Sequence, residues 1–153
     1  MDAIRQNAQL TFKYNKSSGR HGWLRLTPAY SVKMVEQIIS ELDYLPECVF
    51  EPFSGTGTTE LVCSNKNIPA IAYEVNPFLV WLAKVKCSVY SPAVIEKLFK
   101  SASTITSIVS DIPPCDYPPM YNLERWWHSR QLNYLARIKA AIMDEKNSQV
   151  LDL

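Results

Sequence analysis

The chain has 153 residues, of which 47% are hydrophobic and 20% charged, an ordinary balance for one folded domain with its own core. A net charge of +1 excludes a general attraction to polyanions through overall charge. The apolar runs are too short to span a bilayer, and the first residues lack the charged-then-apolar layout of a secretion signal. We therefore expect a cytoplasmic protein with no membrane contact.

The spacing of cysteine and histidine argues against a metal site. No two cysteines form a CxxC pair, and neither His21 nor His128 lies near a cysteine at the spacing of metal ligands. We expect reduced thiols, buried as small apolar groups. The four thiols belong to Cys48, Cys63, Cys87 and Cys115.

The first 22 residues are polar and predict an N-terminal arm or loop. Basic side chains crowd a short Gly- and Ser-containing stretch near the start of the chain, and they either face DNA phosphates or lie in a solvated loop. They are Lys13, Lys16, Arg20, His21 and Arg25. Downstream, Thr27-Pro28 and Ser31 offer helix starts. Apolar residues at helical spacing then predict one amphipathic helix that ends before Pro46.

A strand, a glycine turn and a helix are predicted in direct succession. The apolar run 48–53 predicts a buried strand, followed by a turn at 54–57 and a helix over 58–65. Residues 70–75 predict a second strand, closed by Asn76-Pro77, a helix cap and a first helical residue. This order is a βαβ unit with a right-handed connection, and it predicts an open α/β fold.

The remaining chain predicts helices. The helix after Asn76-Pro77 is expected to bury one side, formed by Leu79, Leu82, Val85 and Val89. Ser91-Pro92 repeats the same start signal, and the Pro-rich link 112–119 precedes a final helical region that includes Trp126-Trp127. The predicted division is an arm (1–22), a βαβ region (23–110), and a link with a C-terminal helical region (111–153).

The glycine turn predicts a ligand site. Gly55 and Gly57 permit backbone angles and a close approach that a Cβ would forbid, and the following helix directs free N–H groups at the turn. A dinucleotide fingerprint would have a third glycine where Glu60 stands, and the lysine of a P-loop is missing. Glu74 follows the second strand, where an acid accepts hydrogen bonds from ribose hydroxyls. A carboxylate and a nucleoside therefore suit this turn better than a triphosphate.

These residues carry a resemblance to a family. The run 50–59 (FEPFSGTGTT) resembles the cofactor motif of DNA amino-methyltransferases, which methylate adenine N6 or cytosine N4. The sequence 74–77 (EVNP) resembles their second motif, and 23–31 resembles the segment that closes over the methionine end of the cofactor. The resemblance implies S-adenosyl-L-methionine as cofactor. It also implies a partial Rossmann-like methyltransferase fold whose sheet is incomplete in this chain.

The same resemblance implies cofactor-binding roles along these motifs. Glu51 would neighbour the cofactor's amino group, Phe53 and Thr27 would pack the methionine, and Pro77 would border the adenine. The full expected set is Thr27, Tyr30, Glu51, Phe53, Ser54, Gly55, Thr56, Gly57, Thr58, Thr59, Glu74, Asn76 and Pro77. No residue of this chain is expected to be catalytic.

The catalytic motif of such enzymes is not found. They use an acid- or Ser-Pro-Pro-aromatic tetrapeptide that holds a flipped-out base beside the cofactor, with no metal. The runs 111–115 (DIPPC) and 116–120 (DYPPM) each have an inserted residue before the prolines and no aromatic after them. Because each added βα unit takes about thirty residues, the chain is also short for a complete sheet. We therefore predict a complementary chain that supplies the motif and the remaining strands, and double-stranded DNA as partner of the assembly.

Two other functions fit parts of the sequence. A catalytically inactive remnant, or a regulatory module that binds cofactor or DNA, agrees with the missing tetrapeptide. A nicotinamide-dependent oxidoreductase would use the same βαβ unit, but Glu60 in place of the third glycine argues against it. The preferred function is the cofactor-binding part of a DNA amino-methyltransferase, of the kind found in restriction–modification systems.

Overall fold

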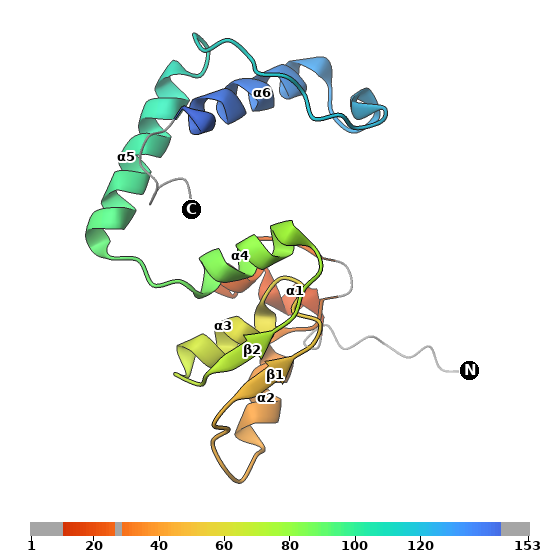
Figure 1. Cartoon of the computed structure of the whole chain (residues 1–153), viewed down its shortest axis with the longest axis vertical. Coiled ribbons are helices and arrows are strands. Elements are labelled where there is room, and N and C mark those ends of the chain that lie inside the picture. Colours follow the sequence, from red (N-terminus) through yellow and green to blue (C-terminus); the bar gives the residue numbers. More distant parts are fainter. Residues whose placement is uncertain (1–10, 27–28, 145–153) are drawn as a thin grey trace. The chain divides into compact units, whose positions relative to one another are not determined.

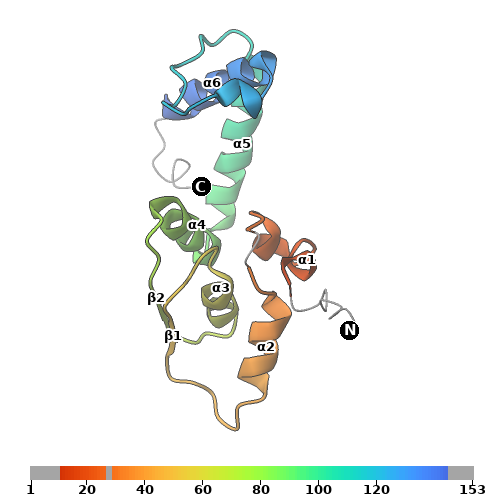
Figure 2. The same ribbon diagram turned by 90° about the vertical axis from the view of Figure 1, so that its right-hand side faces the viewer.

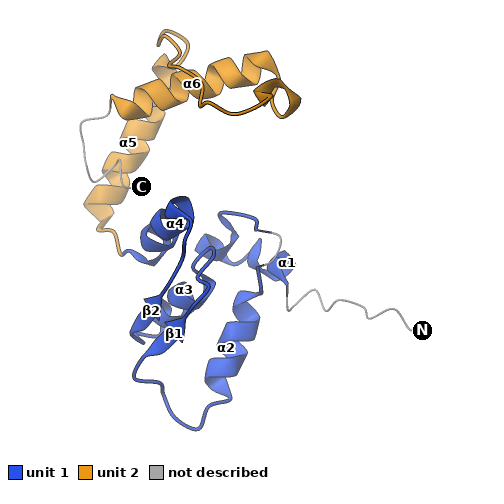
Figure 3. Ribbon diagram, turned by 45° about the vertical axis from the view of Figure 1, so that its right-hand side comes forward, with its two compact units in different colours: residues 1–88 blue, residues 89–153 orange. Residues whose placement is uncertain are grey.

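The computed structural model describes residues 11–26 and 29–144, which form two compact units (Figure 3). The first unit spans residues 1–88 and the second 89–153, whereas the sequence suggested divisions after residues 22 and 110. No helix in the described part of the chain is long and apolar enough to cross a membrane.

The N-terminal unit is built on a parallel βαβ unit (Figure 1). Strands β1 (Val49–Glu51) and β2 (Ala70–Ala72) pair in parallel with Val49 opposite Ala70, and helix α3 (Thr58–Asn65) connects them. The α/β class and the parallel pairing are thus as predicted. The strands are shorter than the apolar runs because residues beyond Glu51 and Ala72 turn away toward the next helices.

Helices cover one face of this sheet only. Helix α3 contacts both strands, and α2 (Val32–Ser40) and α4 (Pro77–Cys87) pack against α3. Figure 2 shows the strands edge-on, with α3 between the sheet and α2. The core lies around α3, whose Leu61, Val62 and Cys63 are buried.

Helix starts in this unit follow the predicted caps. Ser31 Oγ accepts a hydrogen bond from Met34 N (3.1 Å), and Asn76 Oδ1 accepts one from Phe78 N (3.0 Å), with Pro77 as the first helical residue. Three of the four expected core positions of α4 are buried, namely Leu79, Leu82 and Val85. The fourth was wrong: Val89 lies beyond the end of α4 and is exposed.

The segment before α2 is folded, not a loop, from residue 11 onward. It forms the short helices α1 (Phe12–Asn15) and η2 (Gly19–Gly22). Asn15 is fully buried, its Oδ1 accepts from Val32 N (2.7 Å), and its Nδ2 donates to Tyr30 O (3.0 Å). A polar side chain that satisfies backbone groups in this way belongs to the core although its type suggests the surface.

Two of the basic residues near the start point inward. Burial lowers the pKa of His21 to about 4, assisted by the charges of Lys86 and Arg20, so this imidazole is neutral at pH 7. Arg20 Nη1 donates to Ser88 O (2.8 Å) at the end of α4. Arg20 therefore joins the N-terminal segment to the end of α4, and His21 carries no charge at pH 7 that could attract a DNA phosphate.

The uncovered face of the sheet is apolar. Glu51 bonds to Thr59 on α3, so the alternation of side chains directs Phe50 to the opposite face. Phe50, Ile71 and Tyr73 are 61%, 57% and 65% exposed, and the rings of Phe50 and Tyr73 meet edge-on at 5.7 Å. In the part of the chain that the structure describes, β1 and β2 pair only with each other.

The second unit is helical. Helix α5 (Pro92–Ile108) starts at the predicted cap, where Ser91 Oγ accepts from Val94 N (3.4 Å), and it buries none of its residues. After the Pro-rich link come η3 (Leu123–Arg125) and α6 (Ser129–Met143), which buries Leu132, Ala136 and Ala141. Trp126 and Trp127 precede α6 in an exposed turn.

All four cysteines are free thiols, but they are not equally buried. Cys63 is buried in α3, whereas Cys87 and Cys115 are half-buried. The expectation of burial was wrong for Cys48, which is exposed just before β1.

We predict that Gly57→Ala destabilises the protein more than Gly19→Ala. Both glycines have positive φ (72° and 56°), so each change costs about 1 kcal/mol in backbone strain. A Cβ at Gly57 would lie 2.7 Å from Ala83 Cβ on α4, whereas one at Gly19 meets nothing within 4 Å. Overpacking should add about 1–3 kcal/mol for Gly57. Equal losses in urea unfolding would contradict this packing role.

Candidate cofactor site

The turn between β1 and α3 is fixed by backbone hydrogen bonds. Ser54 N donates to Tyr73 O (3.0 Å), which joins this turn to the end of β2, and Gly57 N donates to Ser54 O (2.9 Å). Gly55 and Gly57 both have positive φ. The close approach at Gly57 is to Ala83 on α4, so this glycine serves helix packing, while a Cβ at Gly55 would make only ordinary van der Waals contacts, the nearest with Leu26 at 3.8 Å.

A buried lysine supports the turn from below. Lys86 on α4 is fully buried, and its Nζ donates a hydrogen bond to Thr56 O. Burial lowers the pKa of Lys86, opposed by the charges of Cys87 and Glu60. Lys86 was not among the predicted site residues, although the sequence contains a signal for its burial. It lies seven and four residues after Leu79 and Leu82, a spacing that places it on their buried side of α4.

Glu60 lies in the same buried environment. Its carboxylate oxygens are shielded from solvent at the start of α3. Burial raises the pKa of Glu60, while the nearby Ser54 and Lys86 act in the opposite direction. The residue that replaces the third glycine of a dinucleotide fingerprint thus fills the space beneath the turn.

Three polar side chains join the end of β1 to α2 and α3. Tyr30 Oη donates to Glu51 Oε2 (2.7 Å), Thr59 Oγ1 donates to the same oxygen (2.9 Å), and Glu51 Oε1 accepts from Phe53 N (3.0 Å). Burial alone would raise the pKa of Glu51, but these three hydrogen bonds hold it below its ordinary value. Burial also raises the pKa of Tyr30, which keeps its hydroxyl protonated as a donor.

Glu74 joins the two β–α turns. Its Oε2 accepts from Gly55 N (2.8 Å) in the first turn, and its Oε1 accepts from Asn76 N (2.9 Å) in the second. The hydrogen bond from Asn76, together with that from Gly55, lowers the pKa of Glu74. Each carboxylate oxygen retains a further acceptor position, so hydrogen bonds to ligand hydroxyls remain available.

A cavity of about 290 Å³ opens above the first turn. Seven of the expected cofactor residues line it, and Leu26, Ala29 and Leu79 complete the wall. The seven are Tyr30, Phe53, Ser54, Gly55, Thr56, Thr58 and Glu74. Phe53 is 81% exposed, which is unusual for a large aromatic ring and leaves its face free for a ligand.

The other described members of the expected set lie around this cavity and do not line it. Glu51 and Thr59 lie behind it in the Tyr30 cluster, Gly57 packs on α4, and Asn76 with Pro77 begins α4. Thr27 lies outside the described residues. Sequence reasoning did not select the apolar wall, because Leu26, Ala29 and Leu79 have no side-chain chemistry that marks a site.

The chemistry of the cavity wall favours a nucleoside over a phosphate. Among the described residues, its lining contains no lysine or arginine and one carboxylate, Glu74. The nearest buried cation, Lys86, is directed at Thr56 O beneath the turn. A cationic sulfonium group with ribose hydroxyls fits these donors and acceptors, whereas a triphosphate would lack a counter-charge.

The Pro-Pro runs of the second unit lie in irregular chain. Asp111 follows the end of α5, and 112–119 contain no strand in the structure. Arg137 Nη1 donates to Ser110 O (2.7 Å) and to Ile112 O (2.6 Å), which fixes the start of this link. Neither run therefore ends a strand, as the catalytic tetrapeptide would.

The cavity lies at the carboxyl end of a parallel βαβ unit, and part of the chain is similar in sequence to DNA methyltransferases. The Type II methyltransferases M.AvaI of a Nostoc species and of Anabaena variabilis are each 36% identical to it over 69 residues. M.BsoBI of Geobacillus stearothermophilus is 28% identical over 69 residues. The match covers 44% of this chain and 14% of each relative. No family profile and no solved structure matches the chain.

We predict that Glu51→Gln lowers stability at pH 7 by about 1–3 kcal/mol, because one acceptor of a half-buried cluster becomes a donor. The folded pKa of Glu51 lies below its ordinary value, so the carboxylate stabilises the fold at neutral pH. That contribution is lost as pH falls through the folded pKa. The variant should therefore lose less stability than the parent on acidification. Urea unfolding across this pH range measures both effects.

Glu47→Gln is the matched control. Glu47 is exposed, precedes β1, and makes no hydrogen bond or ion pair among the described residues. It should change the free energy of unfolding by less than about 0.5 kcal/mol. If both variants behave alike, the Tyr30–Glu51–Thr59 cluster does not stabilise the site.

Proposed function

We propose that this chain is the S-adenosylmethionine-binding part of a DNA amino-methyltransferase of a restriction–modification system. The observation that carries the proposal is the cavity above the glycine turn. There Glu74, the turn at 54–57 and the exposed ring of Phe53 form one wall. Similarity to Type II methyltransferases over 69 residues supports the same assignment.

The cavity wall assigns a task to each of these groups. Glu74 would accept hydrogen bonds from the ribose hydroxyls while it holds Gly55 N, so its position depends on both turns. Main-chain groups of the turn would hold the methionine carboxylate, and Phe53 and Tyr30 would pack its side chain. The bound cofactor supplies an electrophilic methyl group, and these residues orient it and exclude water around it.

Isothermal calorimetry with S-adenosylhomocysteine tests the cofactor assignment. Glu74→Ala should weaken binding on the order of 1–3 kcal/mol through lost hydrogen bonds, while Glu47→Ala should leave the affinity unchanged. Urea unfolding of both variants separates binding from folding, since Glu74 also links the two turns. Binding of NAD in place of S-adenosylhomocysteine, or full affinity after Glu74→Ala, would refute the assignment.

A complementary chain would complete the enzyme. The uncovered apolar face of Phe50, Ile71 and Tyr73 supports this proposal, because such a face is ordinarily packed against further elements. So does a second cavity of about 290 Å³ between β2 and α4, where Ala70 and Ala72 remain exposed. The partner would bring strands, the Pro-Pro-aromatic motif and the region that reads the DNA target.

Reconstitution tests the complementary chain. The protein is mixed with a chain that carries an acid- or Ser-Pro-Pro-aromatic motif, duplex DNA and methyl-labelled S-adenosylmethionine. Label should enter DNA only in the mixture, and mass spectrometry of the nucleosides distinguishes N6-methyladenine from N4-methylcytosine. Ile71→Asp should abolish assembly without unfolding the chain, because this side chain is exposed. A complex that binds DNA and cofactor but transfers no methyl group would instead support a regulatory remnant.

A further inference from the structure

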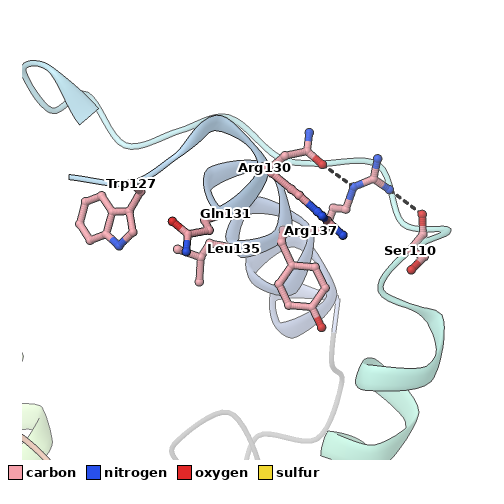
Figure 4. A pocket seen from close by; sticks show the side chains of 8 residues that line it. Ser110, Trp127, Arg130, Gln131, Leu135 and Arg137 are labelled. Atoms are coloured by element: carbon pink, nitrogen blue, oxygen red, sulfur yellow. Dashed lines mark hydrogen bonds between the residues drawn. The ribbon is translucent and has the colours of Figure 1, made fainter. Parts of the chain in front are cut away.

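The second unit contains an open cavity of about 680 Å³ along α6 (Figure 4). Trp127 lies before the first turn of α6, and Arg130, Tyr134 and Arg137 follow at the spacing of one helix face. Gln131 and Asn133 on α6 and Ser110 after α5 add further polar groups to its wall. No residue of the βαβ unit contributes to this wall.

Arg137 lies in the wall of the cavity and is held in place by hydrogen bonds within the protein. Its Nε donates to Asn133 Oδ1 (2.8 Å), and its Nη1 donates to Ser110 O and Ile112 O, as Figure 4 shows for Ser110. The guanidinium thus ties α6 to the chain that follows α5. It contributes positive charge to the wall while its hydrogen bonds are used within the protein.

The remaining donors of the wall have no protein partner. Within the described residues, the guanidinium of Arg130, the indole N–H of Trp127 and the hydroxyl of Tyr134 make no hydrogen bond or ion pair. All three side chains are exposed, Trp127 and Tyr134 by 39% and 46%. Among the residues that the structure describes, the lining includes two arginines and no carboxylate, which gives this part of the wall a positive charge although the whole chain is nearly neutral.

We infer that this face of α6 binds the sugar–phosphate backbone of DNA, with Arg130 on a phosphate and Trp127 and Tyr134 beside it. An unpaired guanidinium next to donor-bearing aromatic rings suits phosphate oxygens and sugars, which receive most protein–DNA hydrogen bonds. Such contacts position the duplex without reading its sequence. The inference rests on the proposed function, because it assigns the methyltransferase's DNA contact within this chain to the second unit.

Fluorescence anisotropy of the full chain with a labelled duplex, over a range of salt concentrations, tests the inference. Arg130→Ala should weaken binding roughly 10- to 100-fold, as for one hydrogen bond between charged groups. It should also reduce the salt-dependence slope by about 0.9, as expected for one lost phosphate contact. Arg130→Lys should keep the slope. Tyr134→Ala should weaken binding without changing the slope, since it removes no charge.

Arg125→Ala is the matched control. Arg125 is exposed in η3, carries the same charge five residues before Arg130, and lines no part of the cavity. Its removal should change the affinity less than twofold, the effect expected of a surface charge alone. The inference would be overturned if Arg125→Ala and Arg130→Ala had equal effects on the affinity for DNA. It would also be overturned if the parent chain did not bind duplex DNA at low salt, or if it bound an acidic protein instead of DNA.

S-adenosylhomocysteine calorimetry on the same variants separates the two proposals. Arg130→Ala should bind S-adenosylhomocysteine like the parent, because this residue lies outside the βαβ unit. If the parent binds DNA through Arg130 but does not bind S-adenosylhomocysteine, the proposed function fails and the DNA surface stands. If it binds S-adenosylhomocysteine but not DNA, the DNA surface fails alone.

Discussion

The carboxylate of Glu74 is the contact on which the arrangement of the candidate site depends. It accepts an amide from each of the two β–α turns, Gly55 N and Asn76 N, and so fixes the distance between them. The two strands are only three residues long and contribute few ladder bonds of their own. Side-chain hydrogen bonds at the carboxyl ends of the strands therefore hold the two turns together, as further ladder hydrogen bonds would in longer strands.

A second layer of polar contacts lies beneath the same turn. Lys86 binds Thr56 O from α4, and the Tyr30–Glu51–Thr59 cluster joins β1 to α2 and α3. Buried polar groups of this kind are stabilising when their partners are present and costly when one is removed. The site is consequently rigid on its protein side and open on its ligand side, where Phe53 is exposed.

Local signals in the sequence predicted the helix starts well. Ser31, Asn76 and Ser91 each combine a capping side chain with a following apolar stripe, and each caps a helix in the structure. Burial of polar residues was less predictable. The helical spacing of Lys86 after Leu79 and Leu82 indicates that it lies on the buried side of α4, but no comparable pattern marks Asn15. Both residues are fully buried because tertiary contacts satisfy their polar atoms, and the sequence does not identify those partner atoms. The candidate site divides similarly: its motif residues were found, and its apolar wall was not.

The open face of the sheet determines how the uncombined chain behaves in solution. Phe50 and Ile71 lie on the two strands and Tyr73 directly follows β2, and the outer edges of these strands have no neighbour among the described residues. Two molecules can therefore stack through these rings or extend each other's ladder, and both reactions accelerate with concentration. Yield during overproduction would then be limited by aggregation kinetics and improved by low temperature and dilution, whatever the thermodynamic stability of the isolated fold.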